Sequence, residues 1–99
     1  MKFFIGQQVE HRRFKYRGVV YDVDPEFSGT EEWYEQMAIS KPPKDKPWYH
    51  VLVHEADHTT YVAERNLKSY EGTGYIDHPM LPGFFDGFKD GVYFRKGRH

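Results

Sequence analysis

The sequence lacks cysteine, long apolar runs and a dominant sign of charge. Without cysteine no disulfide framework can form, which excludes a small secreted scaffold that depends on one. No run approaches the roughly 20 apolar residues of a membrane helix, and the apolar stretch at the start is too short for a signal sequence. Fourteen lysines and arginines against fifteen aspartates and glutamates give a net charge of −1, which excludes a strongly basic arm or an acidic tail. We therefore expect a cytoplasmic protein without a membrane segment.

Aromatic residues, by contrast, are abundant: they make up 18% of the sequence, with eight tyrosines, eight phenylalanines and two tryptophans. Large rings can fill a small core to which few leucines and isoleucines contribute, and disordered chains are poor in them. The chain has 99 residues, and dividing them between two cores would bring each core near the lower limit for unaided folding. We expect one ordered domain.

Alternation of side chains and β-branched or aromatic content predict short strands at residues 9–11, 16–24, 48–54, 59–63 and 67–70. Gly18 lies inside the second of these and suggests a bulge. The period of two in the two best strands predicts a set of mostly buried residues: Val19, Tyr21, Val23, Val51, Val53 and Val62, with Trp48 at least partly buried.

The one helix prediction covers residues 28–39, where Thr30 offers an N-cap and acidic residues follow it. Three prolines within residues 41–47 indicate an extended connection. Beyond Tyr70 glycine and proline interrupt any long element, although five aromatic residues follow: Phe84, Phe85, Phe88, Tyr93 and Phe94. We expect this tail, residues 71–99, to pack on the domain of residues 1–70 or on a neighbouring copy.

Four or five short strands with one brief helix favour a mainly β fold, and specifically a small SH3-like β-barrel with an aromatic, glycine-rich C-terminal extension. The strand lengths suit such a barrel better than a sandwich of seven strands.

Charge is uneven along the chain. Residues 1–20 hold five basic side chains and one acidic one, whereas residues 21–40 hold six acidic and no basic ones. The candidate DNA-binding residues lie in the first of these segments: Arg12, Arg13, Lys15 and Arg17. Their charges can displace counterions from phosphates, and the interleaved rings of Phe14 and Tyr16 can stack on bases. Because neighbours on a hairpin point to opposite faces, only two or three could share a footprint; the alternative is a solvated turn. Three lysines form a second cationic stretch: Lys41, Lys44 and Lys46.

Other chemistry is weakly supported. His50, His54 and His58 recur every four residues, but the spacing loses its metal-binding meaning in a strand and turn. Asp22 and Asp24 could form the carboxylate pair of an enzyme. However, the sequence has no cysteine nucleophile, catalytic triad order or glycine-rich phosphate loop to accompany them. We expect no metal, no cofactor and no catalytic residue, and therefore no enzyme. Four rings could line a groove for a peptide or a modified side chain, with burial in the core as the alternative: Tyr21, Trp48, Tyr49 and Tyr61.

Four blocks of the sequence resemble the YccV/HspQ family, also known as the hemimethylated-DNA-binding domain: residues 6–12, 16–27, 47–53 and 60–67. The blocks occur in the family's order. Uncommon combinations recur in them, such as Trp-Tyr-His at residues 48–50 and Asp-Val-Asp-Pro at residues 22–25, which makes the resemblance specific.

The resemblance implies an SH3-like barrel and a cytoplasmic, heat-shock or stress-associated protein that binds hemimethylated DNA without a catalytic residue. It also implies an adaptor role in degradation by a Lon-type protease, and self-association into small rings, commonly trimers. The near-neutral charge weakens the DNA interpretation, and the edge strands of a small barrel favour protein contacts. Both classes of partner, DNA and protein, therefore stay open.

Overall fold

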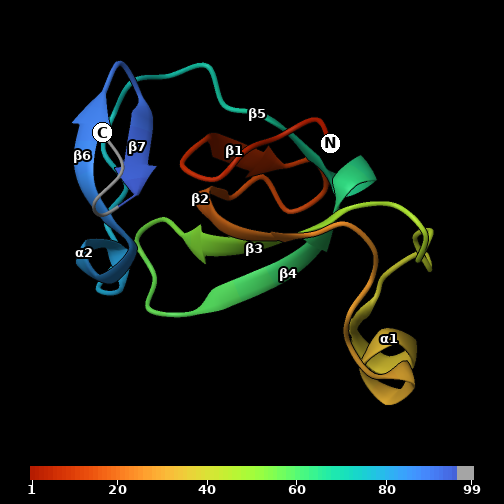
Figure 1. Ribbon diagram of the computed structural model, residues 1–99. Helices are drawn as coiled ribbons and strands as arrows, with labels where there is room; N and C mark the ends of the chain where they lie inside the picture. The colour runs from red at the N-terminus through yellow and green to blue at the C-terminus, as the bar shows by residue number, and fades with distance from the viewer. Residues whose placement is uncertain (96–99) are drawn as a thin grey trace.

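Seven strands lie within residues 1–95, the part of the chain that the computed structural model describes (Figure 1). Five of them form one antiparallel sheet in the order β4-β3-β2-β1-β5. Their bounds are β1 (Gln8–His11), β2 (Arg17–Asp24), β3 (Trp48–Val53), β4 (Thr59–Ala63) and β5 (Leu67–Ser69). The other two, β6 (Phe85–Lys89) and β7 (Val92–Arg95), form a separate hairpin. The helical segments are α1 (Glu31–Met37), the 3₁₀ turn η1 (Glu64–Asn66) and α2 (Leu81–Phe84).

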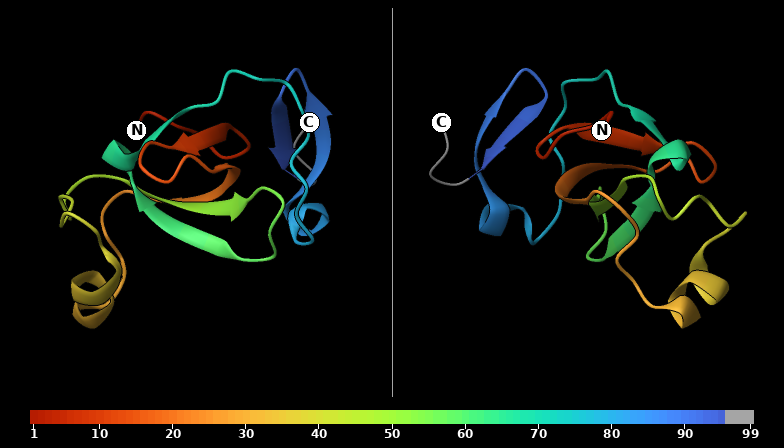
Figure 2. Two further views of the ribbon diagram at one scale, coloured as in Figure 1. Left: turned by 180° about the vertical axis from the view of Figure 1, so that it is seen from behind. Right: turned by 45° about the vertical axis from the view of Figure 1, so that its right-hand side comes forward.

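The mainly β class predicted from the sequence is confirmed, and the strands of the sheet lie where alternation predicted them. Closure of the sheet into a barrel is not confirmed. Within residues 1–95 no ladder joins β4 to β5, so the sheet is open. Figure 2 shows that the β6–β7 hairpin and α1 lie at opposite ends of this bent sheet. None of the helices in the described residues is long and apolar enough to cross a membrane.

Other parts of the chain cover both faces of β2 and β3. Because consecutive strand residues point to opposite faces, each strand packs on both sides. Val20 and Val51 pack on one face of the sheet with residues of β1, β4 and β5. Val19 and Leu52 pack on the other face against residues from the C-terminal part of the chain, namely Ile76, Phe85 and Tyr93. All these side chains are buried. The predicted burial of Val51, Val53, Val62 and Trp48 is also confirmed.

The prediction for Tyr21 and Val23 is wrong in part, because β2 contains a bulge in its middle. The pairing of β2 with β3 shifts register between Val20 and Asp22, and an extra residue in one strand moves the side chains beyond it to the opposite face. Val23 therefore packs with the cluster of Val20, and both Tyr21 and Val23 are only half-buried.

Gly18, where a bulge was expected, pairs regularly with Val53. A Cβ at Gly18 would collide with the carbonyl oxygen of Leu52, so the glycine allows close approach of two strands.

Helix α1 is shorter than the predicted 28–39 but begins as expected. Thr30 is the N-cap, and its hydroxyl accepts a hydrogen bond of 3.1 Å from the backbone N–H of Trp33. At the other end, Lys41 Nζ donates to the carbonyl oxygens of Tyr34 and Glu35, at 3.1 and 2.6 Å. Tyr34 is the buried residue of the helix, and it holds α1 to Trp48 of the sheet.

The β6–β7 hairpin was not predicted, although its turn carries a recognisable signal. Asp90 and Gly91 have φ angles of 53° and 83°, as a two-residue turn with both positions left-handed requires. Tyr93 fastens the hairpin to the sheet region: its N–H donates to Gly6 O at 2.9 Å, and its hydroxyl accepts from Ile76 N at 2.8 Å.

Candidate functional site

The turn between β1 and β2 carries Arg12, Arg13 and Lys15, and all three side chains are exposed. Buried His11 shapes this turn, because its Nδ1 accepts hydrogen bonds of 3.1 Å from the backbone N–H groups of Arg13 and Phe14. Its ring stacks on Phe14, with centroids 4.8 Å apart. Burial and, to a lesser degree, the charge of Arg13 lower the pKa of His11. The backbone of the basic turn is thus anchored to the buried imidazole of His11, which acts as its hydrogen-bond acceptor.

Arg17, the fourth candidate, has a different environment. Its Nη2 donates to the carbonyl oxygens of Tyr75 and Gly74, at 2.6 and 3.1 Å. Its guanidinium also lies 4.5 Å from the ring centroid of Tyr70. Arg17 therefore fastens the segment that follows β5, and it does not join the three exposed cations of the turn.

A cation that the sequence did not single out lies next to this turn. Arg12 donates through its backbone N–H to Asn66 O at 2.8 Å and through Nε to Leu67 O at 3.0 Å, which brings the turn against η1. Exposed Arg65 of η1 donates to Ser40 O at 2.7 Å. Within residues 1–95 no ion pair neutralises the four members of what we term the basic patch: Arg12, Arg13, Lys15 and Arg65.

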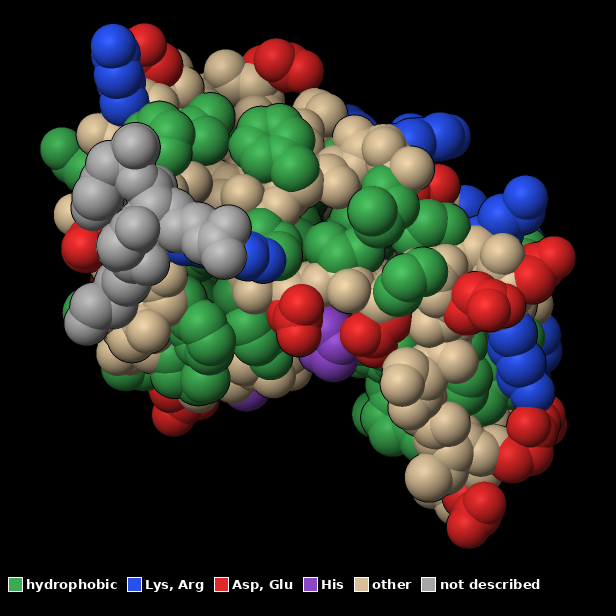
Figure 3. All heavy atoms as spheres, viewed as in Figure 1, with side chains coloured by type: hydrophobic (Ala, Val, Ile, Leu, Met, Phe, Trp, Pro, Cys, Tyr) green, Lys and Arg blue, Asp and Glu red, His purple; other side chains and the backbone are tan. Residues whose placement is uncertain are grey.

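The second cationic stretch is largely neutralised. Lys41 pairs with Glu35 at 3.7 Å, and Lys44 pairs with Glu31 at 2.6 Å. Figure 3 shows this mixture of signs around α1 at the lower right of the molecule. These lysines fasten α1 to the loop after it, and we do not count them among the exposed cations of the basic patch.

A groove of about 490 Å³ lies between the basic turn, α1 and β4. We term it the aromatic groove, because its walls include the rings of Phe14, Tyr16, Trp33, Trp48 and Tyr61. Of the four rings for which a groove was considered, Trp48 and Tyr61 line it. Tyr49 is instead fully buried in the core, and Tyr21 lines a smaller hollow of about 280 Å³ beside Phe84.

Tyr61 is the centre of the ring cluster in the groove. Its centroid lies 4.5 Å from that of His50, 5.2 Å from Trp48 and 5.6 Å from Trp33. Its hydroxyl donates to Asp24 Oδ2 at 2.6 Å. Burial and this carboxylate raise the pKa of Tyr61, so the phenol stays protonated.

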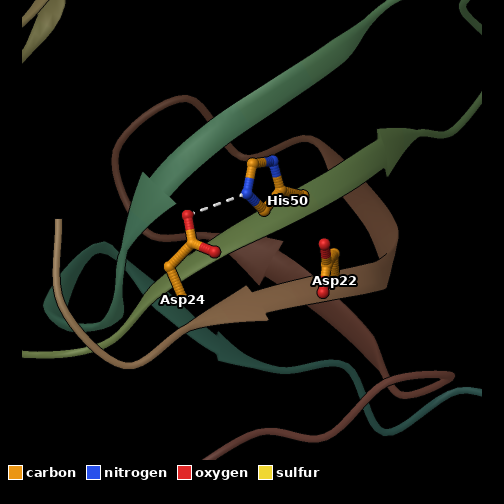
Figure 4. A group of neighbouring side chains, drawn as sticks. All are labelled: Asp22, Asp24 and His50. Carbon is orange, nitrogen blue, oxygen red and sulfur yellow. Dashed lines mark hydrogen bonds and ion pairs between the residues drawn. The ribbon is translucent and has the colours of Figure 1, made fainter. Parts of the chain in front are cut away.

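Asp24, His50 and Asp22 form the one group of possible metal ligands found among the described residues, with ligand atoms within 4.8 Å of one another (Figure 4). His50 Nε2 lies 3.1 Å from Asp24 Oδ2, the oxygen that Tyr61 also donates to. Although burial acts in the opposite direction, these two hydrogen bonds hold the pKa of Asp24 below its usual value. Asp22 Oδ1 accepts from Val23 N. His50 and Tyr61 thus share one oxygen of Asp24, which ties two rings of the groove to the end of β2.

The three histidines spaced by four do not meet in the structure. His54 Nδ1 accepts from Asp77 N at 2.9 Å, and the carbonyl of His58 faces the ring of His78 at 2.9 Å. Both residues therefore lie toward the C-terminal part of the chain, whereas His50 faces the aromatic groove.

The arrangement suits binding to a polyanion that carries flat apolar groups. The basic patch supplies charge for phosphates, and the neighbouring rings supply surfaces for stacking. A comparison with protein-family models matches residues 1–92 to the YccV-like family, described as "Hemimethylated DNA-binding protein YccV like". The match confirms the resemblance carried by the four sequence blocks and extends over β6.

Proposed function

The chain belongs to the YccV-like family, and from this premise we propose that it is a non-enzymatic module that binds duplex DNA, in particular hemimethylated DNA. The observation that carries the proposal is the basic patch: three exposed cations on one ordered turn, with a fourth on η1, and no ion pair to them within residues 1–95. The proposed compartment is the cytoplasm.

Preorganisation supports this proposal despite the net charge of −1. His11 fixes the turn, and the bond from Arg12 Nε to Leu67 O leaves the two Nη groups of Arg12 for phosphates. A charge held in place loses less conformational entropy when it binds. Contacts to three or four phosphates would give a slope of log affinity against log salt of about −3.

We also propose that the bent five-stranded sheet is a partly open relative of the SH3-like barrel, without a ladder between β4 and β5 in the described part of the chain. The support is the strand order β4-β3-β2-β1-β5 together with the 3₁₀ turn that joins β4 to β5. In this arrangement the basic turn and η1 lie side by side at one end of the sheet.

The first prediction tests the basic patch. Arg12→Glu with Arg13→Glu should weaken binding to duplex DNA of any sequence and make the salt slope shallower by about two, because each lost phosphate contact removes roughly one counterion. Fluorescence anisotropy over a salt series measures both quantities. Unmethylated, hemimethylated and fully methylated duplexes of one sequence belong in the same titration, and we expect the hemimethylated duplex to bind best.

The matched control is Lys89→Glu with Arg95→Glu, which reverses two exposed charges on the β6–β7 hairpin. The control changes the net charge by as much as Arg12→Glu with Arg13→Glu does. It should nevertheless keep the salt slope of the wild type. Equal losses of DNA affinity in the two double variants would show that net charge alone matters, and would overturn the assignment of the basic patch as the binding site.

The second candidate function is an adaptor for a Lon-type protease or its substrates, acting through protein contacts and a small homo-oligomer. The observation that favours it is the apolar surface of the C-terminal part, where Tyr75, Met80 and Phe94 are exposed. Exposed apolar side chains become an interface where a second molecule covers them together.

A further inference from the structure

The aromatic groove adjoins the basic patch, and phosphate binding alone leaves it without a role. Arg13 and Phe14 of the basic turn form part of its wall. Its volume of about 490 Å³ lies within the range of roughly 300–1,000 Å³ that small-molecule pockets span.

The apolar surface of the groove is exposed on both of its long walls. Phe14 from the basic turn is 54% exposed, and on the side of α1 Met37 is 60% and Ile39 43% exposed. Half-buried Trp33 and Tyr61 lie between these walls and the buried floor. Flat rings and methyl groups facing solvent favour a ligand with its own flat apolar face.

The charges around the groove favour an anionic ligand over a cationic one. No aspartate or glutamate belongs to its described lining, whereas Arg13 does. Arg65 reaches the same rim through its hydrogen bond to Ser40 O. Behind the rings, the carboxylate of Asp24 already accepts from Tyr61 and His50. A methylated ammonium group, to which aromatic cages are otherwise suited, would meet a positive rim, and the remaining nearby carboxylate, Asp22, lies outside the lining.

Polar groups on the wall can complement the edge of a base. Asn66 is half-buried and lines the groove, and its side-chain amide makes no hydrogen bond within the described residues. An amide of this kind can pair in a bidentate manner with an adenine edge. The Thr59 hydroxyl, on the exposed end of β4, offers a further donor or acceptor.

We propose that the aromatic groove receives a single unpaired nucleobase, extruded from the duplex whose flanking phosphates lie on the basic patch. The inference rests on the proposed DNA function and deepens it by naming where a base is held. An extruded base stacks on Phe14 or Trp33, its edge faces Asn66, and a methyl group on it contacts Met37 or Ile39. Extrusion is easiest for a base whose partner is missing, so such duplexes bind best.

The test compares two duplexes of one sequence, one fully paired and one with a single adenine opposite an abasic site. Fluorescence anisotropy at low salt should show that the second duplex binds at least about fivefold more tightly. This factor corresponds to the lower end of the free energy that one base stacked on an aromatic ring contributes. Phe14→Ala and Trp33→Ala should each reduce this preference, the ratio of the two affinities, toward one, whatever their effect on the affinity for the paired duplex. Arg12→Glu with Lys15→Glu, two patch residues outside the groove lining, should weaken both duplexes together and keep the preference.

Phe4→Ala is the matched control, since Phe4 is 52% exposed and lies outside the groove; it should change neither affinity. Phe14→Ala removes an exposed ring, so it is expected to fold even if Trp33→Ala does not, and circular dichroism verifies this. Binding of the paired duplex with no preference for the abasic partner would overturn the groove and leave the DNA function standing. A preference that survives both groove variants would also overturn it and would assign the groove to another occupant, such as a protein segment. Absence of binding to either duplex would overturn the DNA function itself.

Discussion

His11 illustrates how one side chain determines the shape of a surface site. Its Nδ1 is the acceptor for two backbone N–H groups of the basic turn, so that nitrogen must carry a lone pair and the proton must reside on Nε2. The ring is 7% exposed and stacks between Phe14 and Tyr16. Protonation would place a hydrogen where two donors already point, and it would add a charge beside Arg13.

The pH dependence of stability follows from this geometry. Burial and then Arg13 lower the pKa of His11 below its ordinary value of 6.5, so the unfolded chain binds more protons than the folded one. The contribution of His11 to stability is therefore present above about pH 6.5 and decreases as the pH falls through that value, until it levels off below the folded pKa.

His11→Asn tests the pH prediction, because the Asn carbonyl can replace Nδ1 as an acceptor without titrating. Thermal midpoints between about pH 8 and pH 5 should decrease less steeply in the variant than in the wild type. The other histidines are common to both proteins, so the difference isolates His11. Parallel curves would contradict the assignment.

At the scale of elements, β2 and β3 form the centre of the molecule. β3 buries side chains on both faces, with Val51 inside the sheet and Leu52 beneath the C-terminal segment, and both are fully buried. β2 follows the same pattern with Val20 and Val19 up to its bulge. The bulge bends β2 and turns its end, with Asp24, toward the ring cluster of the groove.

Val51→Ala should destabilise the protein by about 1–2.5 kcal/mol, because two buried methyl groups are lost and a cavity remains. Urea unfolding of the wild type and the variant measures the change. Thr59→Ala is the control within the sheet, because Thr59 is an exposed residue of β4, and it should change stability by less than about 0.5 kcal/mol. A Val51→Ala midpoint equal to that of the wild type would refute the assigned face of β3.

On the scale of the whole molecule, the C-terminal residues form one side of the core. Ile76, Phe85 and Tyr93 cover Val19 and Leu52. Gln8, itself buried, donates from Nε2 to Gly74 O and Gly91 O at 2.8 and 3.0 Å. The aromatic residues that remain exposed on this side, Tyr75 and Phe94, are therefore the ones free to contact another molecule.

The adaptor hypothesis makes its prediction at this scale. The full-length protein should form a small oligomer at high micromolar concentration, and Tyr75→Ser with Phe94→Ser should dissociate it, because both changes remove exposed apolar surface. Light scattering across a concentration series measures the mass. The control is Phe4→Ser, an equally apolar exposed ring at the other end of the chain. A wild type that stays monomeric would remove the ring-forming adaptor and leave a monomeric DNA-binding module.

Local signals in the sequence determined much of the framework. Alternation located the strands of the sheet, the Thr30 cap located α1, and the uncommon combinations at residues 22–25 and 48–50 indicated the family. The exposed part of the candidate site, Arg12 to Lys15, was visible for the same reason: neighbours in a short turn stay neighbours in space. The hairpin turn at Asp90 was equally local and could have been predicted.

Contacts between distant segments decided the rest. The bulge in β2 depends on its pairing with β3 and reverses the face of Val23. Arg17 was withdrawn from the candidate site by carbonyl groups more than fifty residues away, at Gly74 and Tyr75. The aromatic groove draws its walls from four separated parts of the chain, residues 11–16, 33–42, 48–50 and 59–66. Sequence periodicity does not predict these long-range contacts, because it reflects only the local preference of each segment. Packing and long-range hydrogen bonds determine which segments come together.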